Sequence, residues 1–262
     1  MHNQRCSEIS PCASLSRDDG EGGRDNPAEV KASSPIRTSL SEREGSMWGS
    51  LKRPSPRPSL LDECRSDDSE LCHELCSKYG FTQNQMHHTA ERFKLGRSRS
   101  GKTIYWMIDD LGICHDGRIG DSWVSTMLKA RYPSAAPYIC IEHCLFGLHQ
   151  LSLYEDMPIG IVESERSAVI LSEAQPQLLW LAYIYPANLT VNQFEPLQGR
   201  KVTLYPRADP DQTYYWAALE LADQVKRVYD IDISVSSFLD DNTTPAQQSA
   251  NIDLVDYLFE NQ

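Results

Sequence analysis

The chain has 262 residues and a formal net charge of −12, and its length allows one or two domains with a sizeable core. The acidity lies mainly in residues 151–262, which hold 6 Lys and Arg against 17 Asp and Glu. This half alone is not expected to bind nucleic acid non-specifically, because phosphate binding depends on Lys and Arg. Eight cysteines are too few for a disulfide scaffold, no apolar run approaches a membrane span, and no apolar signal core follows the N-terminus, so we expect a cytoplasmic protein without a membrane partner.

Composition divides the chain into three parts. Residues 1–60 are rich in Ser, Pro, Gly, Arg and Asp and show no periodicity. Such a segment cannot bury enough apolar surface to offset the ordering of its backbone, so we predict a disordered tail. Residues 61–150 are predicted to form a small α+β region, and residues 151–262 a second domain.

The stretch from residue 61 to residue 95 is predicted to be helical, with a break at Gly80. Apolar residues recur at helical spacing on both sides of the break: Leu71, Leu75 and Tyr79, then Met86, Ala90 and Phe93.

Cysteines and histidines in this stretch raise the alternative of a zinc site: Cys64, Cys72, His73, Cys76, His87 and His88. Structural zinc sites usually pair their cysteines at short, knuckle-like separations, which this stretch lacks. The spacing of Cys72 and Cys76 also suits small buried residues on one helix face. A second thiol–imidazole group, formed by Cys140, His143 and Cys144, has no visible second half. We interpret both groups as structural.

Residues Gly96–Thr103, with the sequence GRSRSGKT, match the P-loop pattern letter for letter. A P-loop needs a strand before it and a helix after it, so that backbone N–H groups and a helix N-terminus hold the phosphate. Here a helix-like segment precedes the match and a strand-like run follows it, so we interpret the match as accidental. The basic residues of this exposed loop are candidates for contacts with a nucleic-acid backbone: Arg97, Arg99 and Lys102.

Two strand-like runs come next, Thr103–Ile108 and Gly112–Ile119, and turn residues separate them. We expect a β-hairpin here. A short amphipathic segment is expected around Trp123, Met127 and Leu128.

Two later apolar runs each end in acidic residues. The first leads into Glu163, and the second, Lys201–Tyr205, leads to Asp209 and Asp211. Both runs are typical of short buried strands, and ligands of open α/β sheets bind outside the carboxyl ends of such strands. Mg²⁺ prefers carboxylate oxygens, so the three acids are candidate metal ligands. The alternative is that these acids stabilise the N-termini of the helices that follow them.

The remaining elements alternate in type. Helices are expected at Ser167–Ala174, Thr213–Tyr229 and Asp253–Phe259, strands at Leu178–Ile184 and Ile231–Val235, and a loop at Asp240–Ala250. In the longest helix, an apolar face is expected from Trp216, Leu219, Val225 and Val228. This alternation of strand and helix predicts an α/β fold built on a parallel sheet.

The segment Glu163–Ala168, with the sequence ESERSA after a strand, resembles the first motif of the Toprim domain of bacterial primases, topoisomerases and some nucleases. The chain is most similar to a Toprim-like family of uncertain function carried on bacterial mobile elements, over roughly its last two thirds. This resemblance implies a Rossmann-like parallel sheet and a Mg²⁺ cofactor held by a Glu and an Asp-x-Asp pair. It also implies that Glu163 is a catalytic residue. It further implies that the partners of the protein are nucleic acid and replication or mobilisation proteins.

Arg207 stands where the family has the first Asp of that pair, and two functions therefore remain open. The first is a Mg²⁺-dependent phosphotransfer on nucleic acid during mobile-element replication or processing, for which Glu163 and Asp209 are retained. The second is a degenerate Toprim-like fold that acts as a non-catalytic binding or scaffold module. Arg207 favours the second, since a cation beside the remaining carboxylates opposes a metal ion and can pair with Glu163 or Asp209. Bulky Tyr183 and Tyr185, in place of a glycine-rich loop, favour it too.

Overall fold

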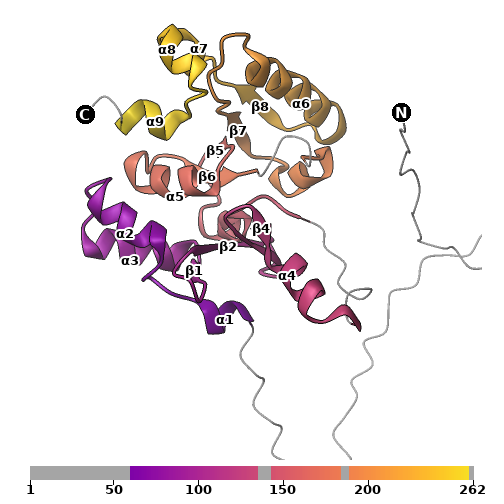
Figure 1. Ribbon diagram of the computed structural model, residues 1–262. Coiled ribbons are helices and arrows are strands. Elements are labelled where there is room, and N and C mark those ends of the chain that lie inside the picture. The colour runs from indigo at the N-terminus through magenta and orange to yellow at the C-terminus, as the bar shows by residue number, and fades with distance from the viewer. Residues whose placement is uncertain (1–59, 135–142, 184–188, 260–262) are drawn as a thin grey trace, which may run out of the picture. The chain divides into compact units, whose positions relative to one another are not determined.

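The structure is a computed structural model that describes residues 60–134, 143–183 and 189–259 (Figure 1). These described residues belong to one compact unit, Ser55–Gln262. The expected disordered tail, residues 1–60, lies outside the described residues except for its last residue. Within the described ranges, no helix is both long enough and apolar enough to cross a membrane.

Three helices begin the described chain: α1 (Leu60–Cys64), α2 (Glu70–Ser77) and α3 (Gln83–Arg92). The predicted apolar face of each of the two longer helices is buried, with Leu75 and Phe93 both fully enclosed. Gly80 lies between them with a φ of +69°, a conformation that glycine adopts without strain. Thr82 and Gln85 form a capping box that fixes the start of α3.

A four-stranded antiparallel sheet follows, in the order β1-β2-β3-β4. Its strands are β1 (Gly96–Arg97), β2 (Thr103–Ile108), β3 (Cys114–Ile119) and β4 (Ser122–Trp123), and α4 (Val124–Arg131) comes after them. The predicted hairpin is confirmed as β2 and β3, and the Asp109 carboxylate fixes its turn by accepting the backbone N–H groups of Leu111 and Ile113. The P-loop-like segment forms the turn between β1 and β2, with Arg97 opposite Thr103, and a strand follows it.

The second sheet is parallel, as predicted, and its order is β6-β5-β7-β8. Its strands are β5 (Ile159–Val162), β6 (Leu179–Ala182), β7 (Lys201–Leu204) and β8 (Asp232–Val235). Helix α5 (Glu165–Ala174) connects β5 to β6, and helix α6 (Thr213–Tyr229) connects β7 to β8. Two 3₁₀ helices, η2 (Leu148–Leu153) and η4 (Val191–Leu197), complete this part of the chain.

The two faces of the parallel sheet are covered by different helices (Figure 1). Successive side chains of a strand point to opposite faces, so Val162 packs with α5 and Ile161 packs with α6. Helix α5 also packs with α2 and α3. Phe93, the residue that follows α3, belongs to the same core as Trp180 of β6. The core therefore joins α2, α3 and β2 to the parallel sheet, and η2 spans the expected boundary at residue 150.

Helix α6 has the predicted bounds, but its predicted apolar face is only partly correct, with Val225 buried and Leu219 half-buried. Trp216 and Val228 are each 60 % exposed, and the buried residues are Ala218, Ala222 and Val225. Two alanines let the helix axis approach the sheet closely, whereas an indole at that contact would hold it away. The size of the apolar side chains therefore does not identify the packed face of this helix.

The expected loop at Asp240–Ala250 contains two short helices, α7 (Phe238–Asn242) and α8 (Pro245–Ser249). Thr244 is the N-cap residue of α8, and its capping box with Gln247 outweighs the poor helix propensity of the surrounding residues. The last helix, α9 (Leu254–Phe259), lies where a terminal helix was expected and packs against α5.

Candidate functional site at the sheet edge

The strand order creates a crevice between β5 and β7. The chain passes from β5 to β6 on one side and later returns to β7 on the other, so the direction of winding reverses between β5 and β7. Ligands of open α/β folds bind at this topological switch point, outside the carboxyl ends of the strands. Glu163 directly follows β5, and Arg207 lies three residues after β7.

Glu163 is held from two sides at the switch point. Its side chain is 7 % exposed, and its Oε2 atom lies 3.2 Å from Nε of Arg207. The backbone N–H of Arg207 donates to the other oxygen at 3.4 Å, and the Tyr183 hydroxyl forms a further hydrogen bond to the carboxylate. Burial raises the pKa of Glu163 above its ordinary value, although the Arg207 cation and these hydrogen bonds oppose the rise.

Tyr183, directly after β6, is part of the site and was identified in the sequence only by its bulk. Burial, and then the adjacent Glu163 charge, raise the pKa of its phenol, so it stays protonated as a donor. A cavity of about 260 Å³ lies beside both side chains and is closed by residues of α6, among them Tyr214, Leu221 and Gln224. Apolar side chains, phenols, an amide and the carboxylate of Glu220 make up this wall, which suits a small polar ligand or an inserted side chain.

The Asp209 carboxylate accepts backbone hydrogen bonds from the loop before α6 and from the first turn of α6. Its Oδ1 atom accepts the N–H of Asp211 at 3.1 Å, and its Oδ2 atom accepts the N–H of Tyr214 at 3.1 Å. Burial tends to raise the pKa of Asp209, but these hydrogen bonds and those from Thr213 outweigh it and hold the pKa below its usual value. The carboxylate thus holds the loop after β7 against the first turn of α6. Asp211 is exposed.

The predicted magnesium ligands do not form a fitting set. Glu163 is paired with a cation, both oxygens of Asp209 accept backbone hydrogen bonds, and Asp211 faces solvent. Over the ranges that the structure describes, no group of three or more His, Cys, Asp or Glu side chains is placed to hold a metal ion. The Glu163 and Asp209 segments thus meet at one sheet edge without forming a preorganised metal site.

The two residues after Ser164 serve the packing of α5. Glu165 is fully buried, and both of its oxygens accept hydrogen bonds at 2.6 Å from Arg118 on β3. Arg166 makes a second bidentate pair with Glu74 on α2, and this pair holds the pKa of Glu74 below its usual value. Both pairs span more than 40 residues of sequence, which is why sequence spacing did not reveal them.

The three residues predicted to contact nucleic acid do not all lie in one groove. Arg97 and Arg99 line a surface groove of about 690 Å³ together with Arg65 and Arg131. Lys102 is not among the residues that line this groove, and its Nζ atom would lie 3.9 Å from a Cβ atom at Gly120. Arg65 and Arg131 come from segments about 30 residues to either side of β1, so they were not identified with this cluster from the sequence.

The cysteine and histidine groups do not converge on a common centre in the described residues. Cys72 is buried and accepts a hydrogen bond from Ser69, while His73 and His87 lie against two different aspartates. Cys140 lies outside the described residues. His143 stacks on Trp123, with the ring centroids 3.9 Å apart, and its imidazole lies 3.4 Å from Asp116.

A family model described as a domain of unknown function (DUF6371) matches residues 69–208. The match begins at the N-cap residue of α2 and contains the antiparallel sheet and strands β5 to β7. It includes Glu163 and Arg207 and ends immediately before Asp209. A search of curated proteins finds no match to the chain.

Proposed function

The chain belongs to the DUF6371 family, whose model matches residues 69–208 of its 262, and from the geometry of the sheet edge we propose a function within it. The protein is a degenerate Toprim-like module that binds a partner or ligand at the Glu163 crevice and performs no magnesium chemistry there. It acts in the replication or processing of mobile-element nucleic acid, alongside replication or mobilisation proteins.

One observation carries this proposal: the ion pair of Arg207 with Glu163 at the topological switch point. Arg207 stands where the Toprim resemblance places the first Asp of the metal-binding pair, and its guanidinium is paired with Glu163 instead. A divalent cation would have to displace a fixed cation that is already 3.2 Å from the carboxylate, and the two positive charges repel. The Asp-x-Asp resemblance thus retains only Asp209, whose oxygens are already used.

The same residues suit recognition without bond cleavage. Glu163 offers a buried acceptor, Tyr183 a buried hydroxyl, and Arg207 a guanidinium that is 35 % exposed. Glu163 and Tyr183 line the small cavity, and Arg207 is paired with Glu163, so this mixed set can orient a ligand or a partner side chain by hydrogen bonds. None of these groups needs a metal ion for this role.

Calorimetric titration with MgCl₂ tests the proposal on the intact chain and on Arg207→Asp. We expect undetectable binding by the native protein and measurable binding by Arg207→Asp, which restores an Asp-x-Asp pair. Arg227→Asp, at an exposed position on α6, makes the same change in net charge away from the crevice and should behave like the native protein.

Nicking and primer-synthesis assays complete the test. Tight magnesium binding and activity in the native chain would establish the phosphotransfer function instead, with Glu163 as its metal ligand and catalytic residue. Absence of binding by both the native protein and Arg207→Asp would mean that Glu163 and Asp209 do not form a Toprim-type site.

A further inference from the structure

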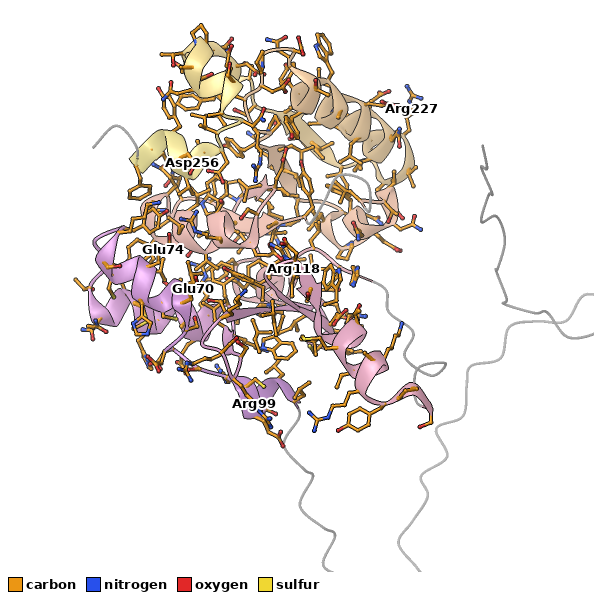
Figure 2. All side chains as sticks on the ribbon, viewed as in Figure 1. Glu70, Glu74, Arg99, Arg118, Arg227 and Asp256 are labelled. Carbon is orange, nitrogen blue, oxygen red and sulfur yellow. The ribbon has the colours of Figure 1, made fainter. Side chains whose placement is uncertain are left out.

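We propose that a groove lined by four arginines, on the antiparallel-sheet half of the unit, binds the phosphates of a nucleic-acid strand. This arginine groove is formed by Arg65, Arg97, Arg99 and Arg131, with Ser66 and Ser98 beside them. Its volume is about 690 Å³. Figure 2 places Arg99 beside α1, far from Arg227 on α6, so the groove and the α6 surface lie at different ends of the unit.

The backbone fixes the spacing of these arginines. Arg65 forms an isolated bridge with Gly96, the residue before Arg97, and the N–H of Ser66 donates to Leu95 at 3.0 Å. The turn that carries Arg99 is closed by the N–H of Ser98, which donates to the carbonyl of Lys102 at 2.9 Å. Three segments distant in sequence, including the last turn of α4, thus bring guanidinium groups to one concave surface.

The charges of the groove are largely available to a ligand. Glu63 is the one carboxylate among the described residues that line it. Arg65 lies 3.7 Å from Glu91, and Arg97 lies 3.7 Å from Asp68, but these side chains are 43–62 % exposed. Exposed pairs of this kind contribute about 0–1 kcal/mol each, so an anion displaces them at little cost.

Arg99 and Arg131 differ from Arg65 and Arg97 in their ion pairs. Within the described ranges, no carboxylate oxygen lies within 4.0 Å of either guanidinium group. Arg131 stacks over the neighbouring Tyr132 ring, at 5.6 Å from its centroid.

A phosphate chain fits this arrangement chemically. Guanidinium groups bind phosphate oxygens through two parallel N–H donors, and serine hydroxyls add further donors. Several arginines along an open groove match the repeating charge of a nucleic-acid backbone, and such contacts carry no base specificity. The rest of the chain is strongly acidic, so electrostatic repulsion elsewhere directs a polyanion to this surface.

The choice of a nucleic-acid strand as the phosphate source rests on the proposed function, whereas the phosphate chemistry of the groove does not. The test is fluorescence anisotropy of a labelled single-stranded oligonucleotide with the intact chain in EDTA at low salt. EDTA removes divalent metal, so this measurement is independent of magnesium binding at Glu163, and failure of one proposal is separate from failure of the other.

The groove variant is Arg99→Glu/Arg131→Glu. Its control is the α6 variant Arg227→Glu/Lys226→Glu, which makes the same change in net charge at the exposed end of α6. We expect the groove variant to bind at least about tenfold more weakly than the native chain. The slope of its log affinity against log salt concentration should become shallower by about 0.7 for each phosphate that the variant no longer neutralises. The α6 variant should remain close to the native protein. Urea unfolding curves establish that both variants are folded, and the exposed positions of the changed residues favour this.

Three outcomes would overturn the proposal. The first is that the native chain does not bind the oligonucleotide at low salt. The second is that the groove variant binds as tightly as the α6 variant. In the third, inorganic phosphate at an equal concentration of phosphate groups displaces the oligonucleotide, which would assign the groove to a small free phosphate.

Discussion

At the scale of single residues, Glu163 is a largely buried carboxylate held by three protein groups. One cation, one phenol and one backbone N–H surround it, and together they leave its pKa still above the ordinary value. Burial is the largest influence on this pKa, so ionising Glu163 is less favourable in the folded protein than in the unfolded chain.

A pH dependence follows from the raised pKa of Glu163. The folded state holds this proton more tightly than the unfolded chain, so the stabilising contribution is fully present below the ordinary pKa of Glu. It is lost as the pH rises through the raised folded-state pKa. We therefore expect the free energy of unfolding of Glu163→Gln, relative to the native chain, to increase as the pH rises from about 4 to about 7.

Urea unfolding at a series of pH values measures this difference. Glu155→Gln, an exposed change in the turn after η2, controls for the loss of one negative charge. A relative stability that falls with pH would mean that the Arg207 pair, rather than burial, dominates the energy of Glu163.

Gly160 sets the packing of β5 against Trp180 of β6 on the α5 face of the sheet. A Cβ atom there would lie 2.6 Å from Cζ3 of Trp180, whose indole is fixed by its hydrogen bond to the carbonyl of Gln175 at 2.8 Å. Gly160→Ala is expected to destabilise the protein by about 1–3 kcal/mol, because the ring has no free space into which to move. In a Trp180→Leu background the same change should cost less, and chemical denaturation of the four proteins measures the coupling. Equal costs in the two backgrounds would contradict the steric explanation.

At the scale of elements, α5 is the connection between the two halves of the unit. Its first two residues form bidentate pairs, Glu165 with β3 and Arg166 with α2, while its apolar face packs on the parallel sheet. The segment that resembles a catalytic motif therefore also holds the fold together.

Removing one partner of the buried pair is expected to be severe. Arg118→Met leaves the fully buried Glu165 carboxylate without its bidentate partner, and we expect a loss of about 3–5 kcal/mol in the free energy of unfolding. Arg118→Met/Glu165→Leu should be more stable than Arg118→Met, because no charge remains buried. Arg227→Met, which breaks an exposed pair on α6, should change stability by about 0.5 kcal/mol or less. Equal effects of Arg118→Met and Arg227→Met in urea unfolding would show that burial of the pair does not matter.

The elements themselves were largely predictable from local pattern. Four apolar runs gave the four parallel strands, and the bounds of α6 agree with the expected helix. The side of α6 that packs on the sheet was not predictable from hydrophobicity, because close approach selected Ala218 and Ala222 over Trp216. The two helices α7 and α8 were missed because only capping chemistry identifies segments of this length.

The candidate site was predictable only in part, for a different reason. The end of a strand identified Glu163, and the departure from Asp-x-Asp pointed to an ion pair with Arg207, which the structure contains. Tyr183 bonds to Glu163 from the end of the neighbouring strand β6. Arg65 and Arg131 reach the arginine groove from segments distant in sequence. These partners depend on strand order and register, which the spacing of residues along a chain does not contain.

At the scale of the whole molecule, the two sheets share a core. Trp180 and the buried residues of α5 pack with Phe93 and the α2 helix, so residues 151–262 alone would expose this face to water. We expect residues 55–262 to unfold in a single cooperative transition, and residues 151–262 alone to show none. Tryptophan fluorescence and circular dichroism during urea unfolding compare the two chains. A cooperative transition of the shorter chain would establish residues 151–262 as an independent domain.

The small contact between Phe146 and Ala182 has a consequence for association between copies of the chain. Phe146 exchanges two backbone hydrogen bonds, at 2.8 and 3.1 Å, with the last residue of the edge strand β6. An unpaired strand edge is a template for a strand from another molecule, and this bridge occupies part of that template. The opposite edge, β8, is four residues long and exposes Asp232. Growth of the sheet from one molecule into the next is thus opposed by a bridge at one side and by a short, acidic strand at the other.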